Sequence, residues 1–136
     1  MNLIKMDRPI CMIASLAMLL DTSIERVLEM ADYKADGARS HHPQELIDIA
    51  SMANVGLVLI EPRPWLEGHG EIEEDWSARL FWHLYKNKGL ICIRTPKDSY
   101  HMVAWDGYHI YDPNGHITDH LPLEHIHYFM RAYPCK

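Results

Sequence analysis

Apolar residues occupy nearly every position of residues 11–20, which read Cys-Met-Ile-Ala-Ser-Leu-Ala-Met-Leu-Leu. Such a segment is typical of a helix buried in a globular core, and it is too short to cross a bilayer. Residues 22–31 open on the capping-box pattern Thr-Ser-Ile-Glu and predict a second helix. A proline and helically spaced apolar positions predict a third helix over residues 43–53. A fourth is predicted over residues 75–88, ended by Gly89.

Shorter apolar runs in the rest of the chain predict strands. Polar, glycine-containing segments at 32–42 and 61–73 are expected to be loops. Because helices come first and strands concentrate later, the pattern favours an α+β fold. We expect the helices to pack on one face of a mostly antiparallel sheet, which would bring the start of the first helix to the hairpin. The predicted strands are residues 55–60, 90–94, both arms of a hairpin within 99–115, and 128–133, the last preceded by a short helix at 122–127.

The hairpin predicted within residues 99–115 places a histidine on one strand near an aspartate on the other. Asp106-Gly107 is a preferred central pair for a two-residue type I′ turn, since both positions need a positive φ. This turn sets His101 directly opposite Asp112 and on the same face of the hairpin. The Cβ atoms of opposed residues lie about 5 Å apart, which permits a hydrogen bond between carboxylate and imidazole. An imidazole held by a carboxylate at one nitrogen acts as a base at the other.

A nucleophile for this base is offered near the other end of the chain. Asp7 or the backbone beside it is expected to cap the first helix, and Pro9 suits its first turn. Cys11 then falls in the first turn of a buried helix, where unpaired N–H groups and the helix dipole favour a thiolate. A thiolate with an oriented imidazole is the arrangement used in nucleophilic acyl transfer. The candidate catalytic residues are therefore Cys11, His101 and Asp112.

The composition narrows the choice of function. A chain of 136 residues predicts a single domain over residues 1–136. The net charge is −6 and no Lys/Arg cluster marks a phosphate track, so a nucleic-acid partner is not predicted. Neither a signal peptide nor a membrane span is recognisable, so a cytoplasmic protein without a membrane partner is expected.

Cysteine and histidine usage adds two further expectations. The chain has three cysteines, and their wide separation at Cys11, Cys92 and Cys135 argues against a disulfide framework and for a reducing compartment. Ten histidines invite a metal interpretation. Four of them lie near the C-terminus, but neither Cys-x-x-Cys nor His-Glu-x-x-His spacing occurs. We therefore predict no metal and no other cofactor.

Three motifs give the chain a resemblance to papain-like cysteine peptidases. They are the apolar block that follows Cys11, the stretch His-Met-Val-Ala-Trp-Asp-Gly from His101, and the Tyr-Asp-Pro around Asp112. In motif and order the chain looks most like the compact bacteriocin-processing peptidases, the leader-cleaving domains of some export transporters. The resemblance implies a papain-like fold with Cys11 as nucleophile, His101 as base and then acid, and Asp112 as orienting group. It also implies a peptide or protein substrate.

The sequence departs from that family at two points. The family usually has a glutamine several residues before the cysteine, and residues 1–10 contain none. Losing one oxyanion donor typically costs roughly 100- to 1,000-fold in rate. The family also often has Asp-Cys-Gly at the nucleophile, whereas this chain has Ile10, Cys11 and Met12. These departures leave open a catalytically inactive peptide-binding module, or a related acyl transfer such as amide exchange or deamidation.

Overall fold

The computed structural model describes residues 1–31, 43–61, 76–97 and 99–134, without the side chains of residues 76–78. Its helices and strands follow the order expected from the sequence, with additional strand structure near the C-terminus. The elements are α1 (Cys11–Leu19), α2 (Ile24–Ala31), α3 (Pro43–Met52), β1 (Val55–Ile60), α4 (Trp76–Leu84), β2 (Gly89–Arg94), β3 (Tyr100–Trp105), β4 (Ile110–Asp112), β5 (His116–Thr118), the 3₁₀ helix η2 (Leu123–His125) and β6 (Ile126–Pro134).

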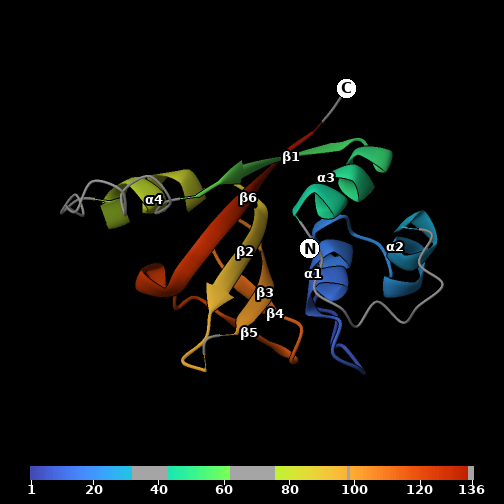
Figure 1. Cartoon of the computed structure of the whole chain (residues 1–136), viewed down its shortest axis with the longest axis horizontal. Helices are drawn as coiled ribbons and strands as arrows, with labels where there is room; N and C mark the ends of the chain where they lie inside the picture. Colours follow the sequence, from blue (N-terminus) through green and yellow to red (C-terminus); the bar gives the residue numbers. More distant parts are fainter. Residues whose placement is uncertain (32–42, 62–75, 98, 135–136) are drawn as a thin grey trace.

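The strands form one open six-stranded sheet in the order β1-β6-β2-β3-β4-β5. Every pairing in it is antiparallel. The last strand, β6, lies between β1 and β2, so the end of the chain joins two segments that are distant in sequence (Figure 1). The chain therefore has an α+β fold with helices packed on an antiparallel sheet, as the sequence predicted.

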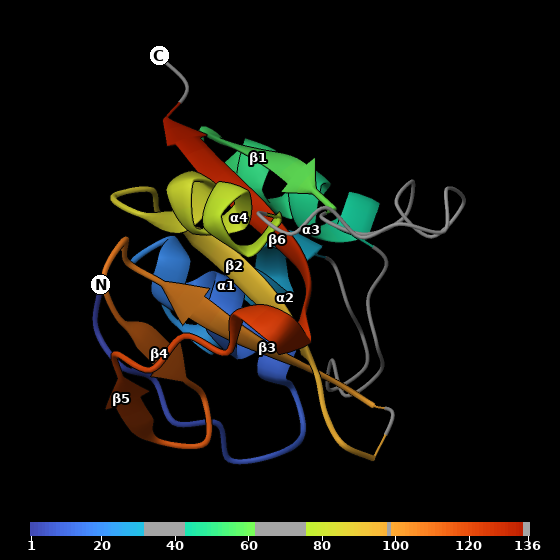
Figure 2. The ribbon, with the colours of Figure 1, turned by 90° about the vertical axis from the view of Figure 1, so that its left-hand side faces the viewer.

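Both faces of this sheet are covered, contrary to the prediction that all helices share one face. Alternate residues of β3 turn to opposite sides: Met102 packs with the helices α1, α2 and α3, whereas Val103 packs with α4. The sheet accordingly lies between α4 and the three other helices (Figure 1), and α4 lies in front of β2 and β6 when seen from its own side (Figure 2). The indole N–H of Trp105 donates to the Leu84 carbonyl at 2.8 Å and ties α4 to β3. This two-sided cover gives β2 and β3 their nearly continuous burial.

Helix boundaries differ from the prediction in ways that local chemistry explains. Ser23, not Thr22, caps α2, because its hydroxyl accepts the Arg26 backbone N–H at 3.1 Å. The helix α4 ends at Leu84, before the predicted stop. Lys86 takes the left-handed conformation, with φ 63°. Gly89 is left free to begin β2.

Two predicted elements near the C-terminus are wrong, and other predictions concern residues that the structure does not describe. Residues 116–118 were expected in a loop but form the edge strand β5. Residues 122–127 were expected as one short helix, but only the 3₁₀ turn η2 forms before β6 begins at Ile126. The predicted loop 32–42, most of the predicted loop 61–73, and Cys135 lie outside the described residues.

Gly89 is required where β2 lies closely against its neighbour β6. A Cβ atom built on Gly89 would collide with the Met130 carbonyl oxygen and the Phe129 ring. We expect Gly89→Ala to lower the free energy of unfolding by about 1–3 kcal/mol, the usual cost of overpacking a buried site. Urea denaturation followed by circular dichroism measures this loss. A variant as stable as the parent would contradict this close approach of the two strands.

Candidate active site

The start of α1 places Cys11 at the surface end of an otherwise buried helix. Residues 13–19 are all buried, whereas Cys11 is partly exposed. The cap residue is Ile10, with φ −128° and ψ 44°, and no side chain caps the helix. The expected cap from Asp7 is thus wrong, and Pro9 precedes the helix instead of lying in its first turn. The prediction that Cys11 lies in the first turn is confirmed.

The segment before Cys11 is fastened to the turn that follows β4. The Met6 backbone N–H donates to the Pro113 carbonyl at 2.8 Å. The Lys5 side-chain stem lies against Gly115, since a Cβ added there would come within 3.1 Å of it. Gly115 has a φ of +111°, a conformation that suits glycine in this tight turn. These contacts bring the N-terminal segment beside Asp112.

The hairpin forms, but its register is not the predicted one. Trp105 pairs with Ile110, which leaves residues 106–109 as the loop instead of a two-residue turn. The side chain of Asp106 explains the longer loop, because it accepts the backbone N–H groups of Tyr108 at 2.8 Å and His109 at 2.6 Å. This register, continued, sets Asp112 opposite Val103. His101 therefore lies diagonally across from Asp112, not directly opposite it.

The expected contact between imidazole and carboxylate is nevertheless present. His101 Nε2 lies 2.9 Å from Asp112 Oδ1, and both side chains are largely buried. The same carboxylate oxygen accepts the Asn114 backbone N–H at 2.8 Å. The other oxygen lies 3.4 Å from Nε2 of His116 on β5. Asp112 is therefore fixed from both sides and holds one ring nitrogen of His101, which leaves Nδ1 for a second partner.

That second partner is the Cys11 thiol, whose interaction with the His101 ring shifts the pKa of both groups. The two meet because the described ladder between β3 and β4 has only two pairs, Ala104 with Tyr111 and Trp105 with Ile110. Beyond the end of β4, the edge of β3 is met by the first turns of α1. The structure thus brings Cys11, His101 and Asp112 together in a single chain of contacts.

The electrostatics of this contact favour an ion pair. Burial acts to raise the pKa of the Cys11 thiol, but hydrogen bonds from the His101 ring and from the Met102 N–H outweigh it, so this pKa is lowered. The hydrogen bond to Cys11, against the opposing effect of burial and helped by Asp112, raises the pKa of His101 to about 9. Both shifts therefore favour the thiolate–imidazolium pair over the neutral thiol and imidazole.

Cys92 is a contrasting thiol in the same core. It is buried on β2 and contacts Tyr128, its neighbour on β6. Burial raises the pKa of the Cys92 thiol to about 11 and also raises that of Tyr128. The charge of Cys11 acts in the same direction on both groups. Cys92 is thus an inert core thiol, as the sequence suggested, and an internal reference for Cys11.

Sequence reasoning missed two groups beside the candidate residues: one bonds the neighbour of His101, and the other contacts Asp112. Ser15 donates its hydroxyl to the Met102 carbonyl at 2.9 Å, and His116 lies against Asp112. A signal for Ser15 was present, because a serine inside an otherwise apolar helix needs a buried partner. His116 gave no such signal, since its approach to Asp112 depends on the unpredicted strand β5.

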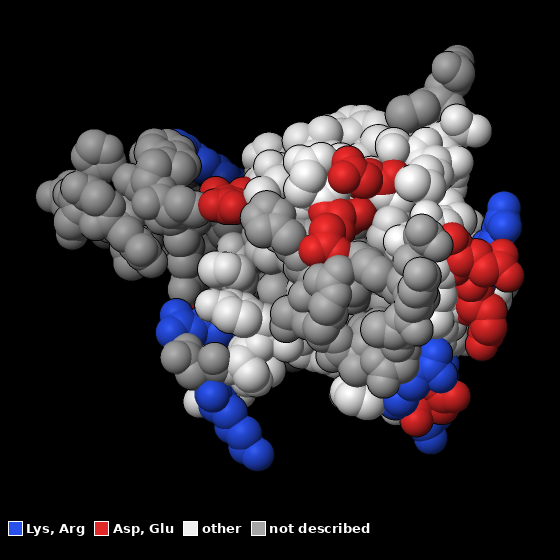
Figure 3. Space-filling view, turned by 45° about the vertical axis from the view of Figure 1, so that its right-hand side comes forward, with Lys and Arg blue, Asp and Glu red and all other residues white. Residues whose placement is uncertain are grey.

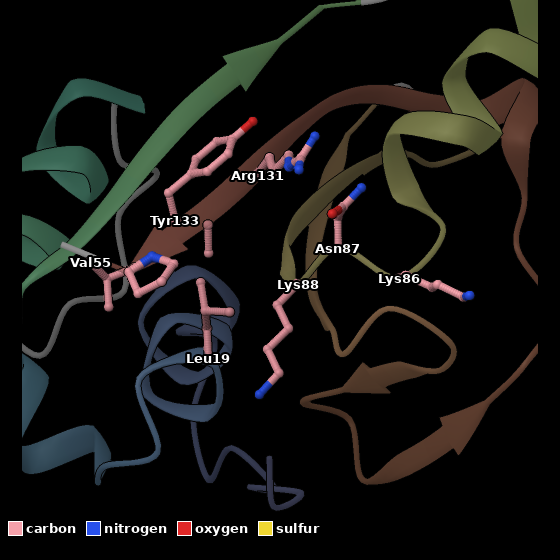
Figure 4. A pocket seen from close by; sticks show the side chains of 9 residues that line it. Leu19, Val55, Lys86, Asn87, Lys88, Arg131 and Tyr133 are labelled. Carbon is pink, nitrogen blue, oxygen red and sulfur yellow. The ribbon is translucent and has the colours of Figure 1, made fainter. Parts of the chain in front are cut away.

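The rest of the described surface was searched for a hollow, a basic patch and a group of metal ligands. A hollow of about 440 Å³ lies at the opposite end of α1, between Leu19, Val55 and Lys88 (Figure 4). On the face shown in Figure 3, Lys and Arg lie at the margins and form no continuous basic surface. Within the described ranges, no three His, Cys, Asp or Glu side chains gather as metal ligands. No helix among the described residues has the length and apolar character needed to span a membrane.

Comparison with known proteins adds no relative. No protein-family model matches the chain. A search of curated proteins gives no significant match either. The geometry of Cys11, His101 and Asp112 is therefore the observation from which a function can be inferred.

Proposed function

We propose that this protein is a cysteine hydrolase that cleaves a peptide or isopeptide bond. The observation that supports this is the contact chain in which the Cys11 thiol meets the His101 ring and the ring meets Asp112 at 2.9 Å. Thiolate, oriented imidazole and carboxylate are the parts needed for nucleophilic acyl transfer. Their order along the chain is that of papain-like peptidases, which the sequence resembles, and a nucleophile at the start of a buried helix beside an antiparallel sheet is consistent with a papain-like fold.

The proposed reaction has two halves. In the first, the Cys11 sulfur attacks the carbonyl carbon of the substrate, the C–N bond breaks, and the His101 imidazolium gives its proton to the leaving amine. In the second, neutral His101 takes a proton from water, the resulting hydroxide attacks the thioester carbon, and the C–S bond breaks. The thiolate and imidazolium are restored, with Asp112 holding the ring throughout.

Stabilisation of the developing oxyanion is assigned to the backbone. The start of a helix presents N–H groups without an intrahelical acceptor, and the N–H of Cys11 lies at the start of α1. Residues 1–10 contain no glutamine to act as the family's side-chain donor, and Asn2, Lys5 and Arg8 are the side-chain donors of a comparable kind near Cys11 in the sequence. We therefore expect a slower hydrolase than one that has both donors, since one donor typically contributes roughly 100- to 1,000-fold in rate.

The dependence of reactivity on pH tests the ion pair. Turnover is expected to rise with pH as Cys11 ionises through its lowered pKa, and to fall near pH 9 as His101 loses its proton. Alkylation by iodoacetamide, located by peptide mass spectrometry, should label Cys11 at a lower pH than an ordinary thiol. Cys92 should remain unlabelled over this range, because burial raises its pKa to about 11. Alkylation of Cys11 with the midpoint of an ordinary thiol would contradict the ion pair.

A non-catalytic peptide-binding module and a related acyl transfer are the alternatives that the missing glutamine and Met12 beside the nucleophile leave open. Mass spectrometry of the products separates the reactions when a peptide is incubated with and without an added primary amine. Hydrolysis gives two fragments that sum to the peptide plus water, whereas transfer gives an amine adduct. Conversion of a side-chain amide to an acid, with the backbone intact, would identify deamidation. Binding of the peptide without any product would identify a non-catalytic module.

A further inference from the structure

Ser15 is the one buried residue with a polar aliphatic side chain among the residues whose side chains the structure describes. It has an exposure of 0% and lies in the otherwise apolar helix α1. Its hydroxyl donates to the Met102 carbonyl at 2.9 Å. A buried hydroxyl costs free energy unless it is hydrogen-bonded, and an apolar residue would fill the same place without that requirement. The position of Ser15 therefore calls for a reason beyond core packing.

The partner of Ser15 supplies that reason. Met102 follows His101 directly on β3, and its N–H hydrogen-bonds the Cys11 sulfur. In a β-strand the N–H and C=O of one residue point to the same edge. Cys11 and Ser15 are four residues apart, so they lie on the same face of α1 about one turn apart. The backbone of Met102 on β3 thus contacts α1 at two places, Cys11 and Ser15.

We propose that Ser15 is a positioning residue, whose hydrogen bond to the Met102 carbonyl fixes α1 against β3 and so sets the Cys11 sulfur at the His101 ring. Its catalytic meaning rests on the proposed hydrolase function, whereas its effect on the thiol does not. Ser15 is fully buried, so it acts through Cys11 and makes no contact with substrate. It is therefore expected to affect the reactivity of the sulfur without affecting substrate binding.

The test replaces Ser15 with Ala in the full chain. Ala is a better helix former than Ser and leaves no large cavity, so the variant is expected to fold. Without the hydroxyl, α1 is freer to move from β3, and the hydrogen bonds that favour the thiolate weaken. The pH midpoint of Cys11 alkylation should rise by about half a unit or more, the equivalent of one ordinary hydrogen bond. We expect kcat to fall by about three- to tenfold with KM nearly unchanged.

Two further variants separate positioning from stability. Ile49→Val shortens a buried side chain on α3, at a cost in stability comparable to that of one hydrogen bond. It should lower the melting temperature without moving the alkylation midpoint. Ser15→Thr keeps the hydroxyl and should keep the midpoint of the parent. An unchanged midpoint in Ser15→Ala, an equal shift in Ile49→Val, or a Thr variant that shifts like Ala would each overturn the proposal.

The experiment also distinguishes failure of this inference from failure of the proposed function. If the parent protein hydrolyses no peptide but Ser15→Ala still raises the midpoint, the function is wrong and the positioning role stands. If the parent hydrolyses peptide through Cys11 but Ser15→Ala leaves both midpoint and kcat unchanged, the function stands and the positioning role is wrong.

Discussion

Replacing Cys11 with Ala is expected to abolish turnover, with a loss of at least about 10⁴-fold in kcat, because the variant lacks the sulfur that we propose as the nucleophile. The melting temperature should change little, since Cys11 lies at the partly exposed start of α1 and the substitution removes one sulfur atom. The measurement is cleavage of a peptide library followed by mass spectrometry, beside a thermal melt of each protein.

The matched control for Cys11→Ala is the same substitution at Cys92. Cys92 belongs to the same core but lies on β2 and contacts Tyr128. We expect Cys92→Ala to be destabilised and still active, the reverse of the Cys11 variant. A Cys11→Ala protein that cleaves the library as fast as the parent would exclude Cys11 as the nucleophile.

Replacing His101 with Ala should lower kcat by about 10³-fold or more and make Cys11 a weak nucleophile at neutral pH. The reason is electrostatic. The hydrogen bond from the His101 ring lowers the pKa of Cys11 against the effect of burial, so its removal leaves burial to raise that pKa. The alkylation midpoint of Cys11 should therefore move upward, and turnover should require a more alkaline solution.

His125 provides a comparison for the His101 variant. It is exposed and lies on η2, where its ring is 3.6 Å from the neighbouring Glu124 carboxylate. His125→Ala should keep the turnover and the alkylation midpoint of the parent. If His101→Ala alkylates at Cys11 with the midpoint of the parent, the imidazole does not stabilise the thiolate and the proposed base is wrong.

Most of the fold was accessible from the sequence because its elements have strong local signals. The apolar run of residues 11–20, the proline at the start of α3 and the short apolar strands each specify one element. The errors in element boundaries arose where two nearby residues could each end a helix. Lys86 adopts a left-handed conformation that glycine usually fills, so Gly89 was wrongly assigned to end α4. The position of α4 on the second face of the sheet is a tertiary result that no local pattern specifies.

The candidate site could be predicted although the predicted hairpin register was wrong, because the error was a shift of two residues. The observed pairing differs by two positions along β4 from the predicted one, and side chains alternate faces with a period of two. His101 and Asp112 therefore remain on one face and still meet. A one-residue error would have separated them. The loop chemistry of Asp106, which accepts two backbone N–H groups, decides the register and is not evident from an Asp-Gly pair alone.

The packing of α1 against the edge of β3 has a consequence for the synthesis of the protein. The Ser15–Met102 bond joins residues 87 positions apart, and the His101 ring that activates Cys11 is similarly distant. Cys11 is synthesised long before His101 and Met102, so we expect it to be an ordinary, weakly nucleophilic sulfhydryl on the ribosome until β3 has docked against α1.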